Sequence, residues 1–255
     1  EKPEYHHTMG NIFRMIGQND SALEAYRRAK NLGATHPATY RAIAELTGEQ
    51  VAEDPQLVRQ LFNQYADSFD QDLQNNLEYS TPLVAYQVFQ KSPAKITVQS
   101  VLDLGCGTGL SIEPFHKEGL RGVGVDISEK MLEQAKEKGL YDSLHCSEIG
   151  SYLEQEKQSY DLVLCLDTLV YIQDLQGILR EVHRCISEGG LFLCSTEKGS
   201  GSKPILQPSG RYAHPQRYFE NLADNLGWTV IHREEANLRK DGDIWIQGNI
   251  WLLQA

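Results

Sequence analysis

The chain has 255 residues, of which 40% are hydrophobic and 23% are charged, values typical of a globular protein long enough to bury a substantial core. Its formal net charge is -11 and it has no block of basic residues, which disfavours unaided binding to nucleic acid or to an anionic membrane. The five cysteines are scattered without CxxC or zinc spacing, and no apolar run approaches the roughly 20 residues that span a bilayer.

Residues 1–52 are predicted to form helices with little strand character. Small and large side chains occur there in the order typical of a tetratricopeptide repeat, at Met9, Gly10, Phe13, Gly17, Ala22, Tyr26, Ala29 and Leu32. The segment resembles one such repeat of about 34 residues, from Pro3 to about His36, followed by a further helix. One repeat cannot bury its own face, so either further repeats precede it or its helices dock onto the rest of the chain. A generic helical hairpin is the alternative.

Residues 53–99 are predicted to form the entry helices of a second domain, which spans residues 53–255. Apolar side chains recur at three- and four-residue intervals from Leu57 to Leu73, which indicates an amphipathic helix with an aromatic end. A second helix is expected to begin at Ser80-Thr81-Pro82.

Strands and helices are predicted to alternate from residue 100 to residue 196. The expected strands are 101–104, 121–125, 142–146, 160–166 and 190–195, and the expected helices are 111–118, 128–138, 149–155 and 174–186. Gly189-Gly190 is expected to end the last of these helices. Residues 197–255 are expected to add a loop (198–210), a helix (215–226) and final strands near 228–232 and 247–254. This order predicts an α/β fold with a doubly wound, mostly parallel sheet covered on both faces.

The most informative stretch is the glycine-rich sequence that directly follows the strand 101–104. Gly105, Gly107 and Gly109 stand at alternate positions, and the next strand ends in an acid, Asp126. Glycine has no Cβ, so such a turn can bend sharply and let a ligand lie against main-chain N–H groups. The carboxyl ends of neighbouring parallel strands meet at one edge of a sheet, where a nucleoside can bind and a carboxylate can accept hydrogen bonds from its ribose.

The spacing of the glycines distinguishes between two kinds of nucleoside ligand. The dinucleotide fingerprint requires glycine at relative positions one, three and six, whereas here the sixth position is Leu110. Asp103, two residues before the first glycine, is poorly suited to a pyrophosphate and suits a ligand with an ammonium group. The pattern therefore disfavours an NAD site.

Asp103 through Gly109, together with Asp126, resembles the first two motifs of class I methyltransferases that use S-adenosylmethionine (SAM). The resemblance covers about residues 55–255 and is strongest from 100 to 196. It implies a Rossmann-like, seven-stranded sheet. It also implies that Asp103 faces the ammonium group of SAM, that Asp126 binds the ribose hydroxyls, and that the turn at Cys106 passes under the ligand.

The resemblance implies further contacts to SAM from the segments around this turn. Ile127 and Met131 would pack on the adenine, and Glu148 or the N–H of Ile149 would bind its amino group. Leu166 would lie beneath the methionine portion. Tyr65, on the entry helix that lids the cofactor in this family, would contact the methionine end, although a core role is an equal alternative for it.

The acceptor side of the site is expected to lie after the fifth strand of this core. His214 is the candidate general base, because its ordinary pKa lies near neutrality; alternatively, it begins the helix that follows. Asp167 is expected to form the wall beside the acceptor, or to cap a short helix. The remaining candidate substrate contacts are Tyr171, Arg211, Tyr212 and Arg217.

These features predict a cytoplasmic SAM-dependent methyltransferase with reduced thiols, no metal site, and no nucleic-acid or membrane partner. Its layout resembles that of bacterial tetratricopeptide-containing methyltransferases of predicted function. The leading prediction is O- or N-methylation of a small metabolite. The alternative is a peptide, protein or carrier-bound substrate recruited by the repeat-like helices. An NAD-dependent oxidoreductase and a non-catalytic scaffold are the remoter alternatives.

Overall fold

A computed structural model describes residues 2–34, 37–47, 55–75, 77–94, 96–207, 209–241 and 243–255. The chain divides into two compact units, one of Glu1–Leu61 with Leu206–Arg211 and the other of Phe62–Ile205 with Tyr212–Ala255. The predicted domain boundary at residues 52 and 53 and the predicted end of the repeat near His36 lie outside the described residues.

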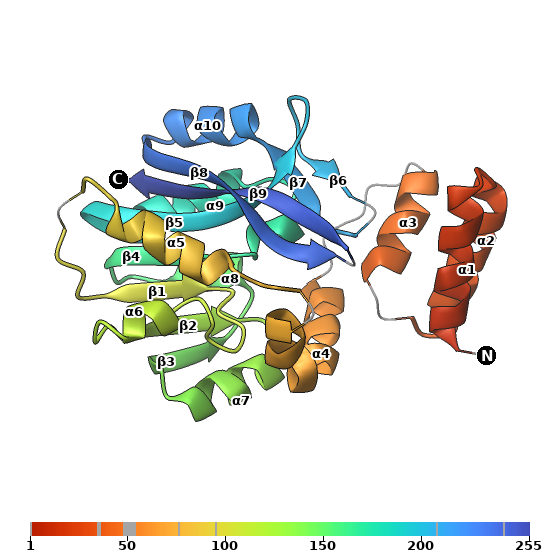
Figure 1. The fold of residues 1–255 in the computed structure, drawn as a ribbon, viewed down its shortest axis with the longest axis horizontal. Coiled ribbons are helices and arrows are strands. Elements are labelled where there is room, and N and C mark those ends of the chain that lie inside the picture. Colours follow the sequence, from red (N-terminus) through yellow and green to blue (C-terminus); the bar gives the residue numbers. More distant parts are fainter. Residues whose placement is uncertain are drawn as a thin grey trace. The chain divides into compact units, whose positions relative to one another are not determined.

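The described residues of the first unit include the helices α1 (Pro3–Met15), α2 (Asn19–Asn31) and α3 (Pro37–Thr47) (Figure 1). Gly10 of α1 lies directly on Tyr26 of α2: a Cβ at this glycine would come within 2.5 Å of the tyrosine ring. The hydroxyl of Tyr26 donates a hydrogen bond to Oδ1 of Asn11 at 2.6 Å. The predicted pairing of small and large residues thus brings the two helices together as a hairpin, while the assignment to the tetratricopeptide family stays a prediction.

The second unit takes in most of α4 (Pro55–Asn75), then α5 (Thr81–Gln90), then alternating strands and helices. In chain order these are β1 (Val101–Leu104), α6 (Glu113–His116), β2 (Gly122–Asp126), α7 (Glu129–Lys138), β3 (Tyr141–Cys146), α8 (Ile149–Gln155), β4 (Tyr160–Cys165), the short 3-10 helix η1 (Leu169–Tyr171), α9 (Gln176–Cys185) and β5 (Ile186–Gly199). After them come β6 (Ile205–Leu206), β7 (Tyr212–Pro215), α10 (Gln216–Asn225), β8 (Thr229–Asp241) and β9 (Ile244–Gln254).

The sheet is mostly parallel, as predicted. Its strand order is β3-β2-β1-β4-β5-β7-β6, and β9 pairs with both β5 and β8. Strands β1 to β5 and β7 pair in parallel, whereas β9 is antiparallel to both of its partners. Since β1 has β2 on one side and β4 on the other, the chain reverses its direction of travel across the sheet beside β1. In open α/β sheets, ligands bind at the carboxyl ends of strands at such a reversal.

The expectation of seven strands is wrong, because the described residues already form a sheet of nine. Strand β5 continues to Gly199 and pairs there with β7, with Glu197 opposite Ala213 and Lys198 opposite His214. The sequence pattern hid β6 and β7, because Gly, Ser and Pro dominate the segment around these short strands. The expected helix end at Gly189-Gly190 is also wrong: α9 ends at Cys185, since Ile186 is already extended (φ -99°, ψ 143°) and begins β5.

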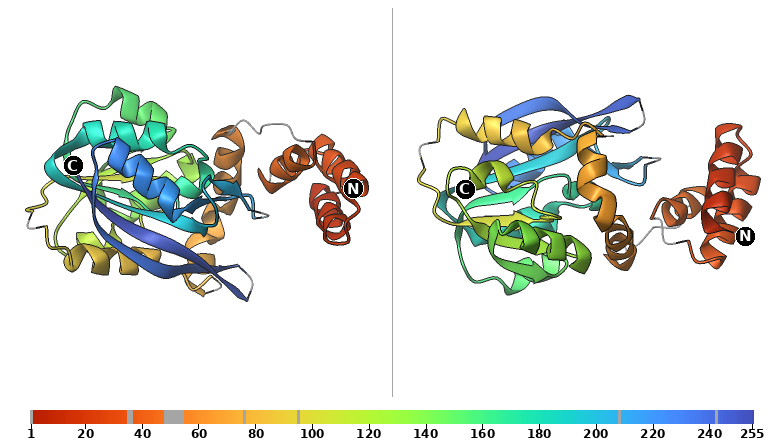
Figure 2. Two further views of the ribbon diagram at one scale, coloured as in Figure 1. Left: turned by 90° about the horizontal axis from the view of Figure 1, so that it is seen from above. Right: turned by 60° about the horizontal axis from the view of Figure 1, so that its bottom comes forward.

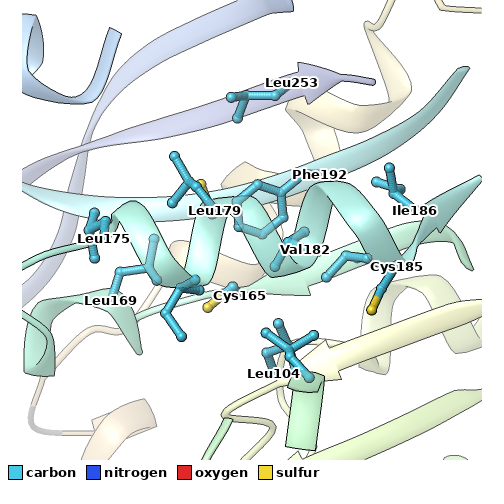
Figure 3. Close-up of a cluster of buried hydrophobic side chains, with 14 of the residues drawn as sticks. Leu104, Cys165, Leu169, Leu175, Leu179, Val182, Cys185, Ile186, Phe192 and Leu253 are labelled. Atoms are coloured by element: carbon cyan, nitrogen blue, oxygen red, sulfur yellow. The ribbon is translucent and has the colours of Figure 1, made fainter. Parts of the chain in front are cut away.

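The two faces of the sheet carry different helices (Figures 1 and 2). One core cluster contains residues of α5, α6 and α7, and the other contains residues of α8, α9 and α10. Successive residues of a strand alternate between them, so that Leu162 and Leu164 of β4 face the first cluster and Val163 faces the second. Figure 3 shows the second cluster around α9, with Phe192 of β5 among its side chains.

We expect Phe192→Ala to lower the free energy of unfolding by about 3–5 kcal/mol, because it removes a fully buried ring and leaves a cavity. The matched control is Leu83→Ala on α5, where the side chain is 58% exposed and the expected change is within about 0.5 kcal/mol. Urea unfolding followed by circular dichroism measures both. A loss below about 1 kcal/mol for Phe192→Ala would contradict this placement of the core.

Candidate functional site

The glycine-rich turn follows β1 at the edge predicted for the ligand. Gly105, Gly107 and Gly109 have φ values of +70°, +53° and +94°, a region that side-chain-bearing residues rarely adopt. A Cβ on Gly105 would come within 2.0 Å of Oγ1 of Thr168, so this position has no room for a side chain. The N–H groups of Gly105 and Cys106 both donate to the carbonyl of Val125, at 2.8 and 3.0 Å, which holds the turn against the end of β2.

Asp126 ends β2 beside this turn, as predicted. Its Oδ2 accepts a hydrogen bond from the N–H of Gly107 at 2.9 Å, and its Oδ1 accepts one from the N–H of Ser128 at 2.8 Å. Burial raises the pKa of Asp126, although these two bonds act to lower it. Each carboxylate oxygen can still accept another hydrogen bond, so the geometry is compatible with a ribose as the further partner.

Asp103 lies fully buried in β1, just before the glycine turn. Its Oδ2 accepts a hydrogen bond of 2.7 Å from the hydroxyl of Tyr141, while its Oδ1 has no hydrogen-bond partner among the described residues. Burial raises the pKa of Asp103 to about 7, the bond from Tyr141 lowers it, and the nearby Asp126 raises it further. A buried acceptor without a donor is costly. The site therefore fits a ligand that brings a donor, such as the ammonium group of SAM.

The residues expected around the adenine follow Asp126 and β3. Met131 is buried in the first turn of α7, and its N–H bonds the capping hydroxyl of Ser128. Glu148 is the N-cap of α8, where its two oxygens accept hydrogen bonds from the N–H groups of Gly150 and Ser151 at 2.8 and 2.7 Å. This cap accounts structurally for Glu148. The adenine contacts expected of Ile127, Met131, Glu148 and Ile149 stay predictions.

The part of α4 from Phe62 onward contacts the glycine turn and the helix after β2, while its role as a lid stays a prediction. Asp70 accepts a hydrogen bond from Thr108 and forms an ion pair with Lys138, both at 2.5 Å. Oδ1 of Asn63 accepts a hydrogen bond from Ser128 at 2.7 Å. Four aromatic rings meet edge to face along this helix and η1, those of Phe62, Tyr65, Phe69 and Tyr171. These contacts join the helix to the turn.

A buried ionic cluster, which the sequence reasoning missed, lies at the ends of the next two strands. Asp167 follows β4 with a φ of +52°, and its Oδ1 pairs with Nη1 of Arg239 at 2.9 Å. The other guanidinium nitrogen of Arg239 pairs with Glu197 of β5. Oδ2 of Asp167 accepts a hydrogen bond from Thr81 at 3.2 Å. The signal of this cluster in the sequence was a charged residue inside or beside each apolar run. Arg239 gave no such signal, because it lies in a part of β8 that was not predicted to be a strand.

His214 lies in β7, and the alternative that it begins the following helix is wrong: Pro215 is the N-cap residue of α10. Its fully buried ring donates a hydrogen bond from Nε2 to the carbonyl of Ile172 at 2.9 Å, whereas Nδ1 has no partner among the described residues. Because Nε2 must carry the proton to donate, Nδ1 is the unprotonated nitrogen of the neutral ring. Burial lowers the pKa of His214 to about 4.

The other side chains predicted to contact the substrate lie in several different parts of the structure. Tyr212 is buried in β7, and Tyr171 is in η1 beside α4. Arg217 is exposed on α10. Arg211 belongs to the first compact unit, so the structure does not place it at this edge.

Three expectations about composition can be compared with the structure. All five cysteines lie in the described residues, none of them forms a disulfide there, and four of them are buried. No group of His, Cys, Asp and Glu in the described part of the chain has the arrangement of a metal site. No helix among the described ranges combines the length and apolarity needed to cross a bilayer.

Comparison with known proteins places this edge of the sheet in a known context. Residues 102–194 match the family model described as a methyltransferase domain. A ubiquinone biosynthesis O-methyltransferase of Sodalis glossinidius is 27% identical over 165 residues, which are 60% of this chain and 66% of that protein. Its counterpart from Idiomarina loihiensis is 32% identical over 102 residues, 38% of this chain and 42% of that protein. The chain thus spans less than two thirds of the length of these relatives.

Two solved structures have a similar fold. Magnesium protoporphyrin IX methyltransferase from Synechocystis PCC 6803, with bound SAM, has a TM-score of 0.60 at 16% identity; the match covers 80% of this chain and 98% of that one. The [4+2]-cyclase SpnF has a TM-score of 0.64 at 14% identity, covering 80% and 97%. At these identities the likeness concerns the fold alone.

The strand order and the glycine turn agree with the resemblance to class I methyltransferases. The family match and the relatives make the similarity more specific: residues 102–194 are similar to a methyltransferase domain, and one solved structure of similar fold holds SAM.

We expect Asp126→Ala to weaken the binding of S-adenosylhomocysteine by roughly 1–3 kcal/mol, the scale of a lost hydrogen bond to a charged group. Calorimetry measures the affinity. Asp224→Ala is the matched control, because Asp224 is an exposed aspartate on α10, on another element of the fold. Equal affinity of the Asp126 variant and the wild type would remove the ribose assignment.

Proposed function

We propose that the protein transfers the methyl group of SAM to an oxygen or nitrogen nucleophile on a small metabolite. The observation that carries the proposal is the buried Oδ1 of Asp103, which lacks a donor and lies beside a glycine turn and a second acid, Asp126. A cationic nucleoside ligand answers all three features. The family match over residues 102–194 supports the same cofactor.

The chain's own residues would mainly bind and orient the reactants. When bound, SAM supplies a methyl group on a sulfonium whose leaving group is a neutral thioether. Asp103 would bind its ammonium group, Asp126 would bind its ribose, and the lid helix α4 would exclude water from the site. Positioning of this kind can lower a barrier by roughly 7–11 kcal/mol.

The acceptor would approach past the ionic cluster of Asp167, Glu197 and Arg239. One guanidinium between two carboxylates leaves a formal surplus of one negative charge at the ends of β4 and β5. Such a wall favours a hydroxyl or an amine, which can donate a hydrogen bond, and disfavours a carboxylate. The curated relatives act on oxygen according to their names, which supports a hydroxyl acceptor.

His214 is the proposed general base for a hydroxyl acceptor, because Nδ1 of its neutral ring has a lone pair without a donor. His214→Gln tests this role, since the glutamine amide can still donate to the carbonyl of Ile172 while the basic nitrogen is lost. We expect kcat to fall by about 10²-fold or more, with unchanged affinity for S-adenosylhomocysteine. The control is Asn221→Ala, on the exposed side of α10 and without an assigned role.

The lowered pKa of His214 predicts a particular pH dependence. The ring stays neutral down to a pH of about 4, so its availability as a base does not fall as the pH drops through the range near 6.5 where an ordinary histidine gains a proton. If His214→Gln has the same kcat as the wild type, His214 is not the base and has a packing role instead.

A peptide, protein or carrier-bound acceptor is the second candidate. It is favoured by the exposed apolar side chains of α1 and of its C-cap residue, Tyr5, Ile12, Met15 and Ile16, with Met15 87% exposed. In this version the repeat-like helices would recruit the partner.

The deciding experiment incubates the protein with isotope-labelled SAM and cell extract, followed by mass spectrometry of the labelled products. Label in small molecules supports the leading proposal, and label only in macromolecules supports the second candidate. Absence of both labelling and S-adenosylhomocysteine binding would overturn both and favour a scaffold. Nicotinamide cofactor binding in calorimetry would favour the oxidoreductase.

A further inference from the structure

Tyr141, the first residue of β3, reaches the candidate cofactor site from two strands away, because its hydroxyl bonds Asp103 of β1. Its side chain is buried, and its hydroxyl donates the 2.7 Å hydrogen bond to Oδ2 of Asp103. This bond reaches across β2, which lies between β3 and β1 in the sheet. It is the hydrogen bond that Asp103 receives on one oxygen, while Oδ1 has no partner among the described residues.

Two glycines make room for the ring of Tyr141. A Cβ on Gly124 of β2 would lie 3.0 Å from Cδ1 of the tyrosine, and a Cβ on Gly109 would lie 3.1 Å from its Cε2. Both distances are shorter than a normal carbon–carbon contact. Alanine at either position would therefore crowd the ring as it stands in this slot.

A β-bulge aims the ring into this slot. Tyr141 pairs with Gly122, but the next pair joins Ser143 to Val123, so that one extra residue is inserted in β3. Such bulges redirect side chains and are common near active sites. Arg121 holds the bulge in place, because it donates to the carbonyl of Tyr141 at 2.6 Å and pairs with Asp142 at 2.9 Å.

We propose that Tyr141 is a positioning residue for SAM: its hydroxyl holds the carboxylate of Asp103 so that one oxygen is satisfied and the other is left for the ammonium group. The inference rests on the proposed function, in which Asp103 binds that group. Tyr141 itself would not contact the cofactor's reacting atoms.

The hydrogen bond from Tyr141 affects the ionisation of Asp103, because the other groups around this carboxyl do not stabilise its charged form. The titratable groups that act on it are Asp126 from β2, Cys106 from the turn, Tyr141 from β3, Cys165 from β4 and Tyr79 from the segment between α4 and α5. None of these groups is a cation. The bond from Tyr141 is thus the interaction within this set that favours the ionised carboxylate, and it lowers the pKa of Asp103 against the effect of burial.

The sign of the pH effect follows from this arrangement. Since the pKa of Asp103 is raised from 3.8 to about 7 on folding, the protonated carboxyl stabilises the ligand-free fold, and this stability is lost as the pH rises through that range. An ammonium ligand needs the ionised form. Its affinity therefore falls as the pH drops below about 7, by up to roughly tenfold per pH unit.

The test is the affinity of Tyr141→Phe for S-adenosylhomocysteine, measured by calorimetry between about pH 6 and about pH 8.5. Loss of the hydroxyl raises the pKa of Asp103, so we expect about tenfold weaker binding near pH 7 and a difference that shrinks to about threefold at the upper end. Tyr160→Phe is the matched control, because the hydroxyl of this tyrosine bonds Glu156 instead.

A second ligand separates positioning from a general structural effect. 5′-Methylthioadenosine has the nucleoside but no ammonium group, so Tyr141→Phe should bind it as the wild type does at every pH. Equal loss of both ligands, or a loss of S-adenosylhomocysteine that does not depend on pH, would overturn the inference.

A variant with a stronger hydrogen-bond donor at position 141 tests the inference even if Tyr141→Phe does not fold. Replacing Tyr141 by 3-fluorotyrosine keeps the shape of the ring and makes the hydroxyl a stronger donor, so the pH profile should move downward. An unmoved profile would also overturn the inference. If the wild type itself does not bind S-adenosylhomocysteine, the proposed function fails rather than the role of Tyr141.

Discussion

The burial of the Asp103 carboxylate is the constraint on which the site depends. Burying an ionisable group without a counter-charge costs free energy unless hydrogen bonds or a ligand offset it. Here Tyr141 satisfies one oxygen and the other is left without a donor among the described residues. The fold tolerates this cost because the core clusters on both faces of the sheet bury many apolar side chains. Stability from the core thus supports a binding group that is itself unfavourable in the ligand-free state.

The parallel sheet concentrates negative charge at one edge. Asp103, Asp126, Asp167 and Glu197 lie in or directly after β1, β2, β4 and β5, and Arg239 pairs with the latter two. The acids of β1 and β2 are left to the cofactor half, which suits a ligand that carries both a sulfonium and an ammonium group. The pair at β4 and β5 is partly neutralised, which suits an acceptor with little charge. The two acids of β1 and β2 are thus separated from the ionic cluster of β4 and β5 at the point beside β1 where the strand order reverses.

The sequence predicted those parts of the site that local signals determine. Glycines at alternate positions, a short apolar strand before them and an acid at the end of the next strand lie close together in the chain, so the positions of Asp103, Gly105 and Asp126 at one edge of the sheet could be predicted directly. Arg239, Glu197 and Tyr141 could not, because their partners lie 42, 72 or 38 residues away. The role of Tyr141 arises from a bulge and from the space above two glycines, which depend on pairing between strands. The short strand β7 was missed for the same reason, since it pairs with β5 only where β5 extends beyond its pairing with β4, which ends at Cys194.

The choice of acceptor depends on the part of the chain for which relatives give the least information. The match to the methyltransferase family ends at residue 194, whereas Glu197, His214 and Arg239 all follow it. A fold of this kind also occurs in a [4+2]-cyclase, so the sheet and its helices do not determine the reaction. What differs between proteins of one fold is the chemistry presented beyond the shared strands. In this chain that chemistry is one guanidinium shared by two carboxylates and a neutral imidazole with an unpaired nitrogen. A substrate search restricted to hydroxyl and amine acceptors follows directly from these groups.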